Sequence, residues 1–214
     1  MSFFITFEGI EGCGKSTQVQ LLAKALTSRD MDVVVTREPG GCAIADQIRN
    51  ILLDAANSGL TPSAELLLYA AARAQHVAEV VRPALQAGRM VICDRFTDAT
   101  VAYQGYGRGL DLATIARLNA DASGGTRPDL TILLDCPVEI GLKRAFARIN
   151  STAGAREERF ELESTQFHQR VRDGYLTLAA EQPERFAVVD GSLAVDETAA
   201  ATLAAFSRKA GISL

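Results

Sequence analysis

The sequence predicts an α/β fold, in which a five-stranded parallel sheet lies between two layers of helices and carries a small mobile lid. Short runs of Val, Ile, Leu and Phe alternate with longer segments of helical periodicity. The short runs are nearly all apolar, which is typical of strands covered on both faces. Strands that alternate with helices form parallel sheets with helical crossovers. With 214 residues, 48% of them hydrophobic, we expect one domain spanning 1–214.

Five apolar runs are the predicted strands, and the segments between them are predicted helices. The strands are Phe3–Phe7, Val33–Thr36, Met90–Cys93, Thr131–Leu134 and Phe186–Val189. The helices are Lys15–Ser28, Ala43–Ala56, Ala64–Gln86, Leu112–Ala122, Val138–Ala147, Gln166–Ala180 and Glu197–Lys209. In the first helix, Val19, Leu22 and Leu26 share one face because they stand at i, i+3 and i+7.

One segment, 148–163, breaks this alternation. Its centre is polar and rich in Gly, Ser and Thr, with one arginine before that centre and arginines and acids after it. By composition alone it is a solvated surface loop. Its position late in an α/β chain also fits a mobile excursion over a site.

Composition excludes several classes of protein. The net charge of −4 argues against a general nucleic-acid binder, which usually carries a basic surplus. No stretch approaches the roughly 18 apolar residues of a membrane span, and the N-terminus does not resemble an export signal. Four scattered cysteines, without a CxxC pair, predict reduced thiols and a cytoplasmic protein.

Residues 9–16, "GIEGCGKS", fit the phosphate-binding pattern G-x-x-x-x-G-K-[ST]. An apolar strand precedes the pattern and an amphipathic helix follows it, which is the context that the pattern requires. Glycines let the backbone curl so that successive N–H groups converge on phosphate oxygens, and the helix adds its positive end. We expect this loop to bind a nucleoside triphosphate through Gly9, Ile10, Glu11, Gly12, Cys13, Gly14, Lys15, Ser16 and Thr17.

Acidic and hydroxyl side chains near the loop predict a magnesium site. Lys15 supplies a positive charge near the β- and γ-phosphates, and the Ser16 hydroxyl is a Mg²⁺ ligand in this motif. Asp94 ends the third predicted strand, where an open α/β sheet carries its functional groups. Glu8 ends the first strand, and we expect it to contact Mg²⁺ or a sugar hydroxyl, with a structural hydrogen bond as the alternative.

Three arginines in distant segments predict a second anion site. Arg37 and Arg95 follow predicted strands, and Arg73 lies in an otherwise apolar helix. Together they would clamp a monophosphate, for which the arginine fork suits better than lysine; alternatively, Arg73 reaches back to water. Tyr69 stands one helical turn before Arg73, so it either stacks on a nucleobase or packs in the core.

The glycine-rich stretch "TVAYQGYGRG" carries Tyr103, Gln104 and Tyr106, which either read a base or cover a tight loop. Arg108 in the same stretch is a further candidate for an anion. We interpret His76 and His168 as helix-surface residues. The chain contains no Asn-Lys-x-Asp pattern, so a guanine-nucleotide switch is not predicted. A kinase for a small substrate needs an acceptor pocket, arginines for a second phosphate and a lid.

The set "FEGIEGCGKST", "TREPGG", "YAAARAQH", "DRF", "AYQGYGRG" and "RPDLTILLD" resembles the bacterial thymidylate kinase family, a nucleoside-monophosphate kinase branch of the P-loop proteins. The resemblance runs from about residue 3 to the C-terminus. It implies a five-stranded parallel sheet, a homodimer, and transfer of phosphate from ATP with Mg²⁺ to dTMP. It also implies that the acceptor is bound by Glu8, Arg37, Tyr69, Arg73, Arg95, Thr100, Tyr103 and Gln104.

The resemblance further implies catalytic arginines, supplied either by the phosphate-binding loop or by the lid. This loop carries Ile10 and Glu11 and no basic residue at those positions, so the lid at about 148–163 must supply them. The predicted catalytic set is Lys15, Arg95, Glu8, Arg148, Arg156 and Arg159. Arg159 is the first candidate, and its replacement by Ala is expected to lower kcat far more than it raises KM. Two alternatives stay open: a kinase for UMP, CMP or a purine monophosphate, and a regulatory module that binds ATP without transfer.

Overall fold

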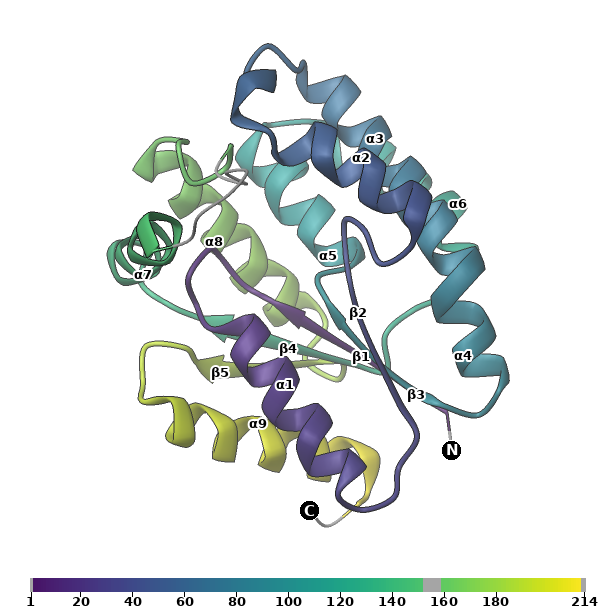
Figure 1. Ribbon diagram of the computed structural model, residues 1–214. Helices are drawn as coiled ribbons and strands as arrows, with labels where there is room; N and C mark the ends of the chain where they lie inside the picture. Colours follow the sequence, from purple (N-terminus) through teal and green to yellow (C-terminus); the bar gives the residue numbers. More distant parts are fainter. Residues whose placement is uncertain (1, 152–158, 213–214) are drawn as a thin grey trace.

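The computed structural model describes residues 2–151 and 159–212, and five strands form one parallel sheet within these ranges. The order across the sheet is β2-β3-β1-β4-β5, and every neighbouring pair is parallel (Figure 1). The strands are β1 (Phe3–Glu8), β2 (Val33–Arg37), β3 (Met90–Asp94), β4 (Leu130–Asp135) and β5 (Phe186–Asp190). Each contains its predicted run, so the predicted fold class is confirmed.

Helices cover both faces of the sheet. Helices α1 and α9 pack on one face, while α4 and α8 lie on the other (Figure 1). Beyond α4, helix α3 packs against both α2 and α6 as a further cover. The α-helices are α1 (Lys15–Thr27), α2 (Ala43–Leu53), α3 (Pro62–His76), α4 (Arg82–Gln86), α5 (Thr97–Thr100), α6 (Leu112–Ser123), α7 (Val138–Ser151), α8 (Thr165–Glu181) and α9 (Val195–Ala210).

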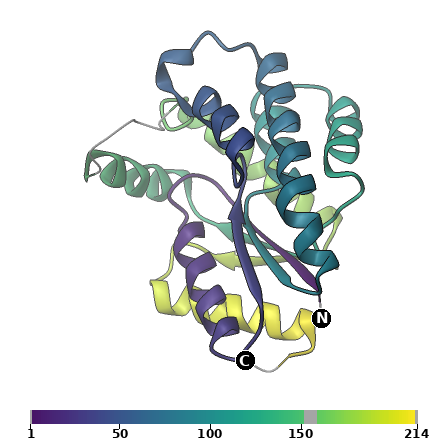
Figure 2. The ribbon, with the colours of Figure 1, turned by 45° about the vertical axis from the view of Figure 1, so that its right-hand side comes forward.

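Two helical segments differ from the prediction. The helix expected over Ala64–Gln86 is a continuous rod, in which a π-helical turn, η2 (Val77–Val81), joins α3 to α4 (Figure 2). The helix expected over Ala43–Ala56 stops at Leu53, and a short 3₁₀ turn, η1 (Ala55–Asn57), follows.

The glycine-rich stretch after β3 is helical, although the sequence predicts no helix there. Helix α5 runs directly into the π-helical turn η3 (Val101–Gly107). Its glycines serve packing rather than a turn: a Cβ on Gly105 would lie 2.5 Å from Leu112, and one on Gly107 would lie 2.7 Å from Phe167. Close approach of neighbouring side chains therefore accounts for these glycines, which lowered the expected helicity of the segment.

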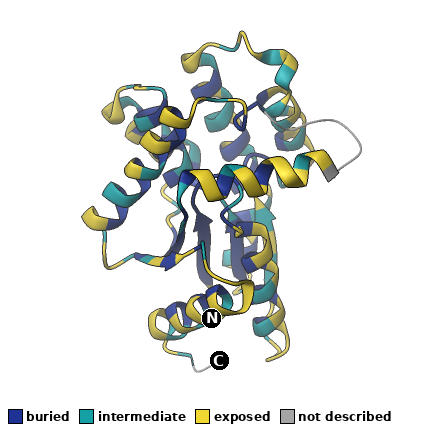
Figure 3. Ribbon diagram, turned by 90° about the vertical axis from the view of Figure 1, so that its left-hand side faces the viewer, coloured by how far each residue is buried: buried dark blue, intermediate teal, exposed yellow. Residues whose placement is uncertain are grey.

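The two edge strands, β2 and β5, are less buried than predicted, because helices do not cover both of their faces fully. Strands β1, β3 and β4 are buried almost throughout, whereas Val35 in β2 is 40% exposed and Val188 in β5 is 53% exposed. Figure 3 shows the buried strands between helices whose outer sides are exposed. Neither edge has a further strand beside it, and so the apolar composition of β2 and β5 overestimates their burial.

The predicted lid falls at the end of α7. Residues 148–151 extend that helix, which projects from the body with much of its surface exposed (Figure 3). Residues 159–163 form a turn that leads into α8. Within the described ranges, no helix combines the length and apolar character needed to cross a membrane.

Candidate active site

A large cleft lies along the carboxyl ends of the strands, where parallel sheets place their sites. Its volume is about 940 Å³. The phosphate-binding loop lies at one end, α3 and η3 lie at the other, and α7 borders it between them. The cleft therefore joins the two regions that the sequence assigns to donor and acceptor.

The phosphate-binding loop has the backbone that its glycines predict. Gly9 and Gly14 have φ angles of 136° and 98°, in the region that glycine alone adopts readily. Gly14 is the N-cap residue of α1, so the first free N–H groups of the helix open into the loop. Gly12 has a second function, because a Cβ there would collide with the carbonyl of Gly141 in α7. Loop and helix thus touch backbone to backbone.

Lys15 is buried and bonds the loop that contains it. Its Nζ donates to the carbonyl oxygens of Gly9 and Ile10, at 3.0 and 2.8 Å, and lies 3.5 Å from Cys13 Sγ. The side chain therefore folds back over the loop instead of extending to water. This fixes a positive charge at the centre of the phosphate cradle.

Ser16 and Asp94 come together as the magnesium prediction requires. Ser16 Oγ donates a hydrogen bond to Asp94 Oδ2 at 2.9 Å. A hydroxyl and a carboxylate are the hard oxygen donors that Mg²⁺ takes, and Mg²⁺ at such sites is bound by few protein groups and several phosphate oxygens. The described part of the chain has no group of three or more His, Cys, Asp or Glu side chains arranged to hold a metal ion.

Glu8 does not join this pair. Its side chain is wholly buried behind the cleft, where Oε1 accepts from the Phe96 backbone N–H at 2.7 Å and Oε2 accepts from Tyr175 Oη at 2.7 Å. Burial, and to a smaller extent the nearby Asp98, raise the pKa of Glu8 to about 8, against the lowering effects of Arg95 and the two hydrogen bonds. The structural hydrogen bond that the sequence left open is the role seen here, in place of a metal or sugar contact.

Arg73 lines the cleft from a fully buried position. Its Nε donates to Glu38 Oε2 at 2.7 Å, Nη1 to Asn119 Oδ1 at 2.7 Å, and Nη2 to the Phe96 carbonyl at 3.0 Å. The guanidinium also lies over the Phe96 ring, 5.3 Å from its centroid. Three bonds hold the fork, so Arg73 does not reach back to bulk water.

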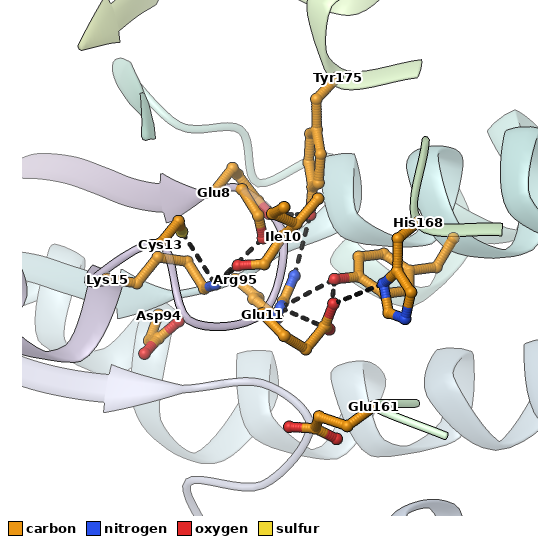
Figure 4. Close-up of polar contacts among 12 residues, drawn as sticks. Glu8, Ile10, Glu11, Cys13, Lys15, Asp94, Arg95, Glu161, His168 and Tyr175 are labelled. Atoms are coloured by element: carbon orange, nitrogen blue, oxygen red, sulfur yellow. Dashed lines mark hydrogen bonds and ion pairs between the residues drawn. The ribbon is translucent and has the colours of Figure 1, made fainter. Parts of the chain in front are cut away.

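Arg95 is held on the other side of the acceptor region. Nη1 donates to Tyr175 Oη at 3.1 Å, and Nη2 lies 3.0 Å from Tyr103 Oη and 3.2 Å from Glu11 Oε1 (Figure 4). Its backbone has a φ of 71°, which is unusual for a residue with a Cβ. This conformation turns the chain immediately after β3 and directs the side chain into the cleft.

Arg37 differs from the other two arginines of the predicted clamp. Its side chain is 56% exposed, and its ion pair with Asp46 is long, at 3.4 Å. It lines the cleft but is not held in place as Arg73 and Arg95 are. The structure therefore prearranges two members of the clamp and leaves the third on the surface.

Aromatic and amide side chains form the end of the cleft near α3. Tyr69, Thr100, Tyr103 and Gln104 all line it, as predicted. Thr100 Oγ1 is buried without a partner in the described structure, so it is available to a ligand. Gln104 donates to the buried carboxylate of Glu65 at 2.8 Å, which orients its amide. Tyr106 and Arg108 do not line the cleft; Arg108 instead pairs with Glu65.

The lid arginines do not form one group. Arg148 lines the cleft, is 61% exposed, and lies 3.4 Å from Glu161. Arg159 is buried and bound elsewhere: Nη1 pairs with Glu65 at 2.7 Å and Nε donates to the Leu52 carbonyl at 2.5 Å. Arg159 is therefore not in the catalytic position that the sequence predicts. Its ion pair with Glu65 holds it beside the end of the cleft near α3, where the base is expected to bind (the base end). Arg156 lies outside the described residues.

Sequence reasoning missed several cleft residues. Phe160 lines the cleft and packs against Tyr103, with ring centroids 5.4 Å apart. Arg144 donates to the carbonyls of Gly191 and Ser192 at the donor end. Other missed lining residues are Glu38, Arg49 and Glu161. Phe160 could have been predicted from the sequence "ERFE", because it is the aromatic residue of an otherwise mostly polar segment.

The interpretation of both histidines as surface residues is wrong. His76 and His168 are each 0% exposed, and each faces a glutamate. A signal for this was present in the sequence. His168 shares a helix face with Val171 and Tyr175, at i, i+3 and i+7, and His76 stands three residues after Arg73.

Comparisons with known proteins agree with this geometry. Residues 7–201 match the family described as "Thymidylate kinase". A "Thymidylate kinase" from Geotalea uraniireducens is 69% identical over 205 residues, covering 96% of each chain. One from Geobacter sulfurreducens is 65% identical and covers 94% of each. A crystal structure of thymidylate kinase from Ehrlichia chaffeensis superposes with a TM-score of 0.75 at 35% identity, covering 95% of this chain and 97% of that one.

Proposed function

The chain belongs to the thymidylate kinase family, and on that premise we propose how its residues divide the transfer of a phosphoryl group from ATP to dTMP. It is an enzyme that phosphorylates dTMP to dTDP, and the alternatives of another monophosphate kinase and of a regulatory module are not favoured. The observation that carries the assignment of roles is that Arg73, which is buried, and Arg95, which is partly buried, face one cleft with the phosphate-binding loop.

The acceptor nucleotide lies at the α3 and η3 end of the cleft. Arg73 and Arg95 bind its phosphate, and Arg37 adds a third, weaker contact from the surface. Tyr69 and Phe160 enclose the base, while Thr100 and Gln104 offer hydrogen-bonding groups to its edge. The buried and unpartnered Thr100 hydroxyl supports a polar contact with the ligand.

The donor triphosphate lies in the loop formed by residues 9–17. Backbone N–H groups and the N-terminus of α1 bind its phosphates, and Lys15 neutralises charge on the group that is transferred. Ser16 and Asp94 would hold Mg²⁺, which would supply positive charge to offset that of the phosphates. Their hydrogen bond at 2.9 Å supports a shared site for these two side chains.

The chemical step needs positioning and charge neutralisation more than proton transfer. An acceptor phosphate is already an anion near neutral pH, so its oxygen attacks without a strong general base. Arg73 and Arg95 keep that oxygen in line with the transferred phosphoryl group, and Lys15 stabilises the charge spread over its equatorial oxygens. Glu8 is left out of this set because its carboxylate is enclosed by Phe96 and Tyr175.

The lid at 148–163 divides into two roles under this proposal. Arg148 is the described lid arginine that lines the cleft, and it approaches the transferred phosphate. Arg159 fastens the base end, because it joins Glu65, which also orients Gln104. The contribution of Arg156 stays a prediction from sequence.

A homodimer is the proposed assembly, formed by the exposed sides of α2 and α3. Ile44 and Ile51 in α2 are 50% and 47% exposed, and Leu67 in α3 is 57% exposed. Small residues Ala71 and Ala74 continue the same exposed side of α3. Leu67→Glu should shift the mass measured by light scattering from dimer to monomer, while the matched change Val188→Glu on β5 should not.

The proposed location is the cytoplasm, where thiols stay reduced. All four cysteines are free, and three of them are buried. This pattern supports a reducing compartment without requiring a role for any single thiol.

A coupled ADP-release assay tests the proposed function. Wild-type protein should turn over dTMP with ATP and Mg²⁺, with dUMP slower and UMP and dGMP near background. Lys15→Ala is the control, and should abolish turnover while the protein stays folded. Faster turnover of UMP than dTMP would overturn the base assignment, and equal activity with Arg73→Met would overturn the phosphate assignment.

A further inference from the structure

The two histidines of the chain occupy equivalent positions in two separate clusters. Each is fully buried, each has Nδ1 close to one oxygen of a glutamate, and the other oxygen of that glutamate meets an acceptor arginine. We name these clusters the β2 triad (His76, Glu38, Arg73) and the loop triad (His168, Glu11, Arg95).

The β2 triad is closed by well-formed bonds at every step. His76 Nδ1 lies 3.0 Å from Glu38 Oε1, and Arg73 Nε donates to Glu38 Oε2 at 2.7 Å. The second ring nitrogen, Nε2, lies 2.7 Å from Thr36 Oγ1. A carboxylate can only accept, so Nδ1 carries a proton and donates to Glu38, while Nε2 faces the Thr36 hydroxyl.

The loop triad has the same connectivity with looser geometry (Figure 4). His168 Nδ1 is 3.1 Å from Glu11 Oε2, but neither atom has a well-aligned hydrogen bond. Glu11 Oε1 accepts from Tyr103 Oη at 2.5 Å and from Arg95 Nη2 at 3.2 Å. His168 Nε2 has no partner among the residues that the structure describes.

The chemistry of both triads points to one purpose. A glutamate side chain has three rotatable bonds, so one contact at one oxygen leaves the carboxylate free to turn. A second contact, from an imidazole on the other oxygen, removes that freedom and fixes the edge offered to the guanidinium. The same arrangement orients ligands around bound metals, where a partner behind the ligand controls its direction.

We propose that His76 and His168 are positioning residues of the acceptor site, each setting the direction of one arginine through one glutamate. This rests on the proposed roles of Arg73 and Arg95 in binding the acceptor phosphate. Neither histidine lines the cleft, so neither touches the substrate. Their contribution passes through Glu38 and Glu11.

A double-mutant cycle on the loop triad tests this. His168→Phe removes the donor, and should raise KM for dTMP roughly tenfold, within the range of coupled neighbours, with little change in KM for ATP. His168→Asn can put an amide nitrogen where Nδ1 was, and should restore most of the loss. His168→Gln puts it where Nε2 was and should not. In a Glu11→Gln background, His168→Phe should have no further effect beyond about twofold.

Several outcomes overturn the proposal. One is a His168→Phe effect of the same size with and without Glu11, since a purely structural role predicts independence. Another is equal impairment of His168→Asn and His168→Gln. If His168→Phe does not fold, as judged by thermal melting, the comparison of the Asn and Gln variants still decides between the two nitrogens.

The β2 triad gives a second, parallel cycle. His76→Phe should raise KM for dTMP in the wild-type background but not beyond Glu38→Gln. The roles of the arginines are checked separately with Arg95→Met. An unchanged KM for dTMP in Arg95→Met would remove the proposed function of that arginine, whereas a raised KM without coupling to His168 would remove only the positioning role.

Discussion

The two triads hold similar arginines in unlike surroundings. In the β2 triad, Arg73 is 1% exposed and has three bonded partners, and His76 is fixed on both sides. In the loop triad, the Arg95 side chain is 19% exposed, and His168 is bonded on one side by a poorly aligned contact. The difference teaches that the acceptor clamp has a rigid half and an adjustable half. The adjustable half includes the phosphate-binding loop, where donor and acceptor meet.

Replacing Arg73 or Arg95 should have the largest effects, and comparing the two variants tests the difference between the two triads. Arg73→Met leaves buried Glu38 short of its cation, and should cost about 3–5 kcal/mol of unfolding free energy. Arg95→Met should cost less, because Glu11 keeps Tyr103 and His168. Both should lower kcat/KM for dTMP at least about 100-fold, since each removes a charged contact with the acceptor phosphate. Urea denaturation and steady-state kinetics measure the two effects.

An equal loss of stability in the two variants would contradict the distinction between a rigid and an adjustable half. Arg73→Lys is the matched control for charge. It keeps the cation but cannot bond three partners in a fork, and should recover little of the activity.

Glu8, which lies beside Arg95 and not beside Arg73, should make the free energy of unfolding depend on pH. Its hydroxyl partner, Tyr175, also bonds Arg95. The pKa of Glu8 is raised from 4.5 to about 8 by burial, so the folded state binds more protons than the unfolded state between those values. Stability therefore falls as pH rises through this window, by on the order of 5 kcal/mol for this group.

Glu8→Gln should flatten that slope, as measured by urea denaturation at several pH values between 5 and 8.5. Glu139→Gln, at an exposed position in α7, is the control and should leave the slope unchanged. An unchanged slope in Glu8→Gln would mean that the carboxyl titrates alike in the folded and unfolded chain.

Arg159→Ala should have a moderate effect confined to the acceptor. The structure replaces the sequence expectation, since Arg159 bonds Glu65 and the Leu52 carbonyl at the base end. We expect KM for dTMP to rise about fivefold to tenfold with kcat lowered less, because Glu65 loses its charged hydrogen bond to Arg159 but keeps Arg108, and so still orients Gln104 in part. A large fall in kcat at unchanged KM would return Arg159 to the catalytic set.

Arg37→Ala should have the smallest effect. An exposed ion pair contributes about 0–1 kcal/mol, so the unfolding free energy should change by less than that. KM for dTMP should rise no more than about fivefold, as measured by initial rates. Arg29→Ala, at another exposed position, is the control for loss of surface charge. A loss as large as that of Arg73→Met would extend the rigid half of the clamp to β2's surface.

Local patterns were enough to predict much of this. The strands could be predicted because each is a short apolar run, and the phosphate-binding loop because its chemistry is contiguous in sequence. Arg73 and Arg95 could be placed near a second site from their motifs. These features depend on residues within a few positions of one another.

The parts that sequence missed depend on distance. Glu11 and His168 are 157 positions apart, and Arg159 reaches Glu65 across 94 positions, so no local pattern joins either pair. The helical stretch 97–107 was missed for another reason. Its glycines have low helix propensity, and tertiary contacts with Leu112 and Phe167 outweigh that propensity.

The backbone contact between Gly12 and Gly141 has a consequence for variants of the enzyme substituted at either position. Even a methyl group at either position would push the phosphate-binding loop away from α7, because a Cβ on Gly141 would lie 2.5 Å from the Glu11 carbonyl oxygen. Position 141 lies outside the phosphate-binding pattern of residues 9–16, yet a bulkier residue there should impair ATP binding by displacing the loop. Substitutions at this position should therefore give temperature-sensitive variants. Such variants would lose ATP binding more severely at higher temperature, while their catalytic side chains stay unchanged.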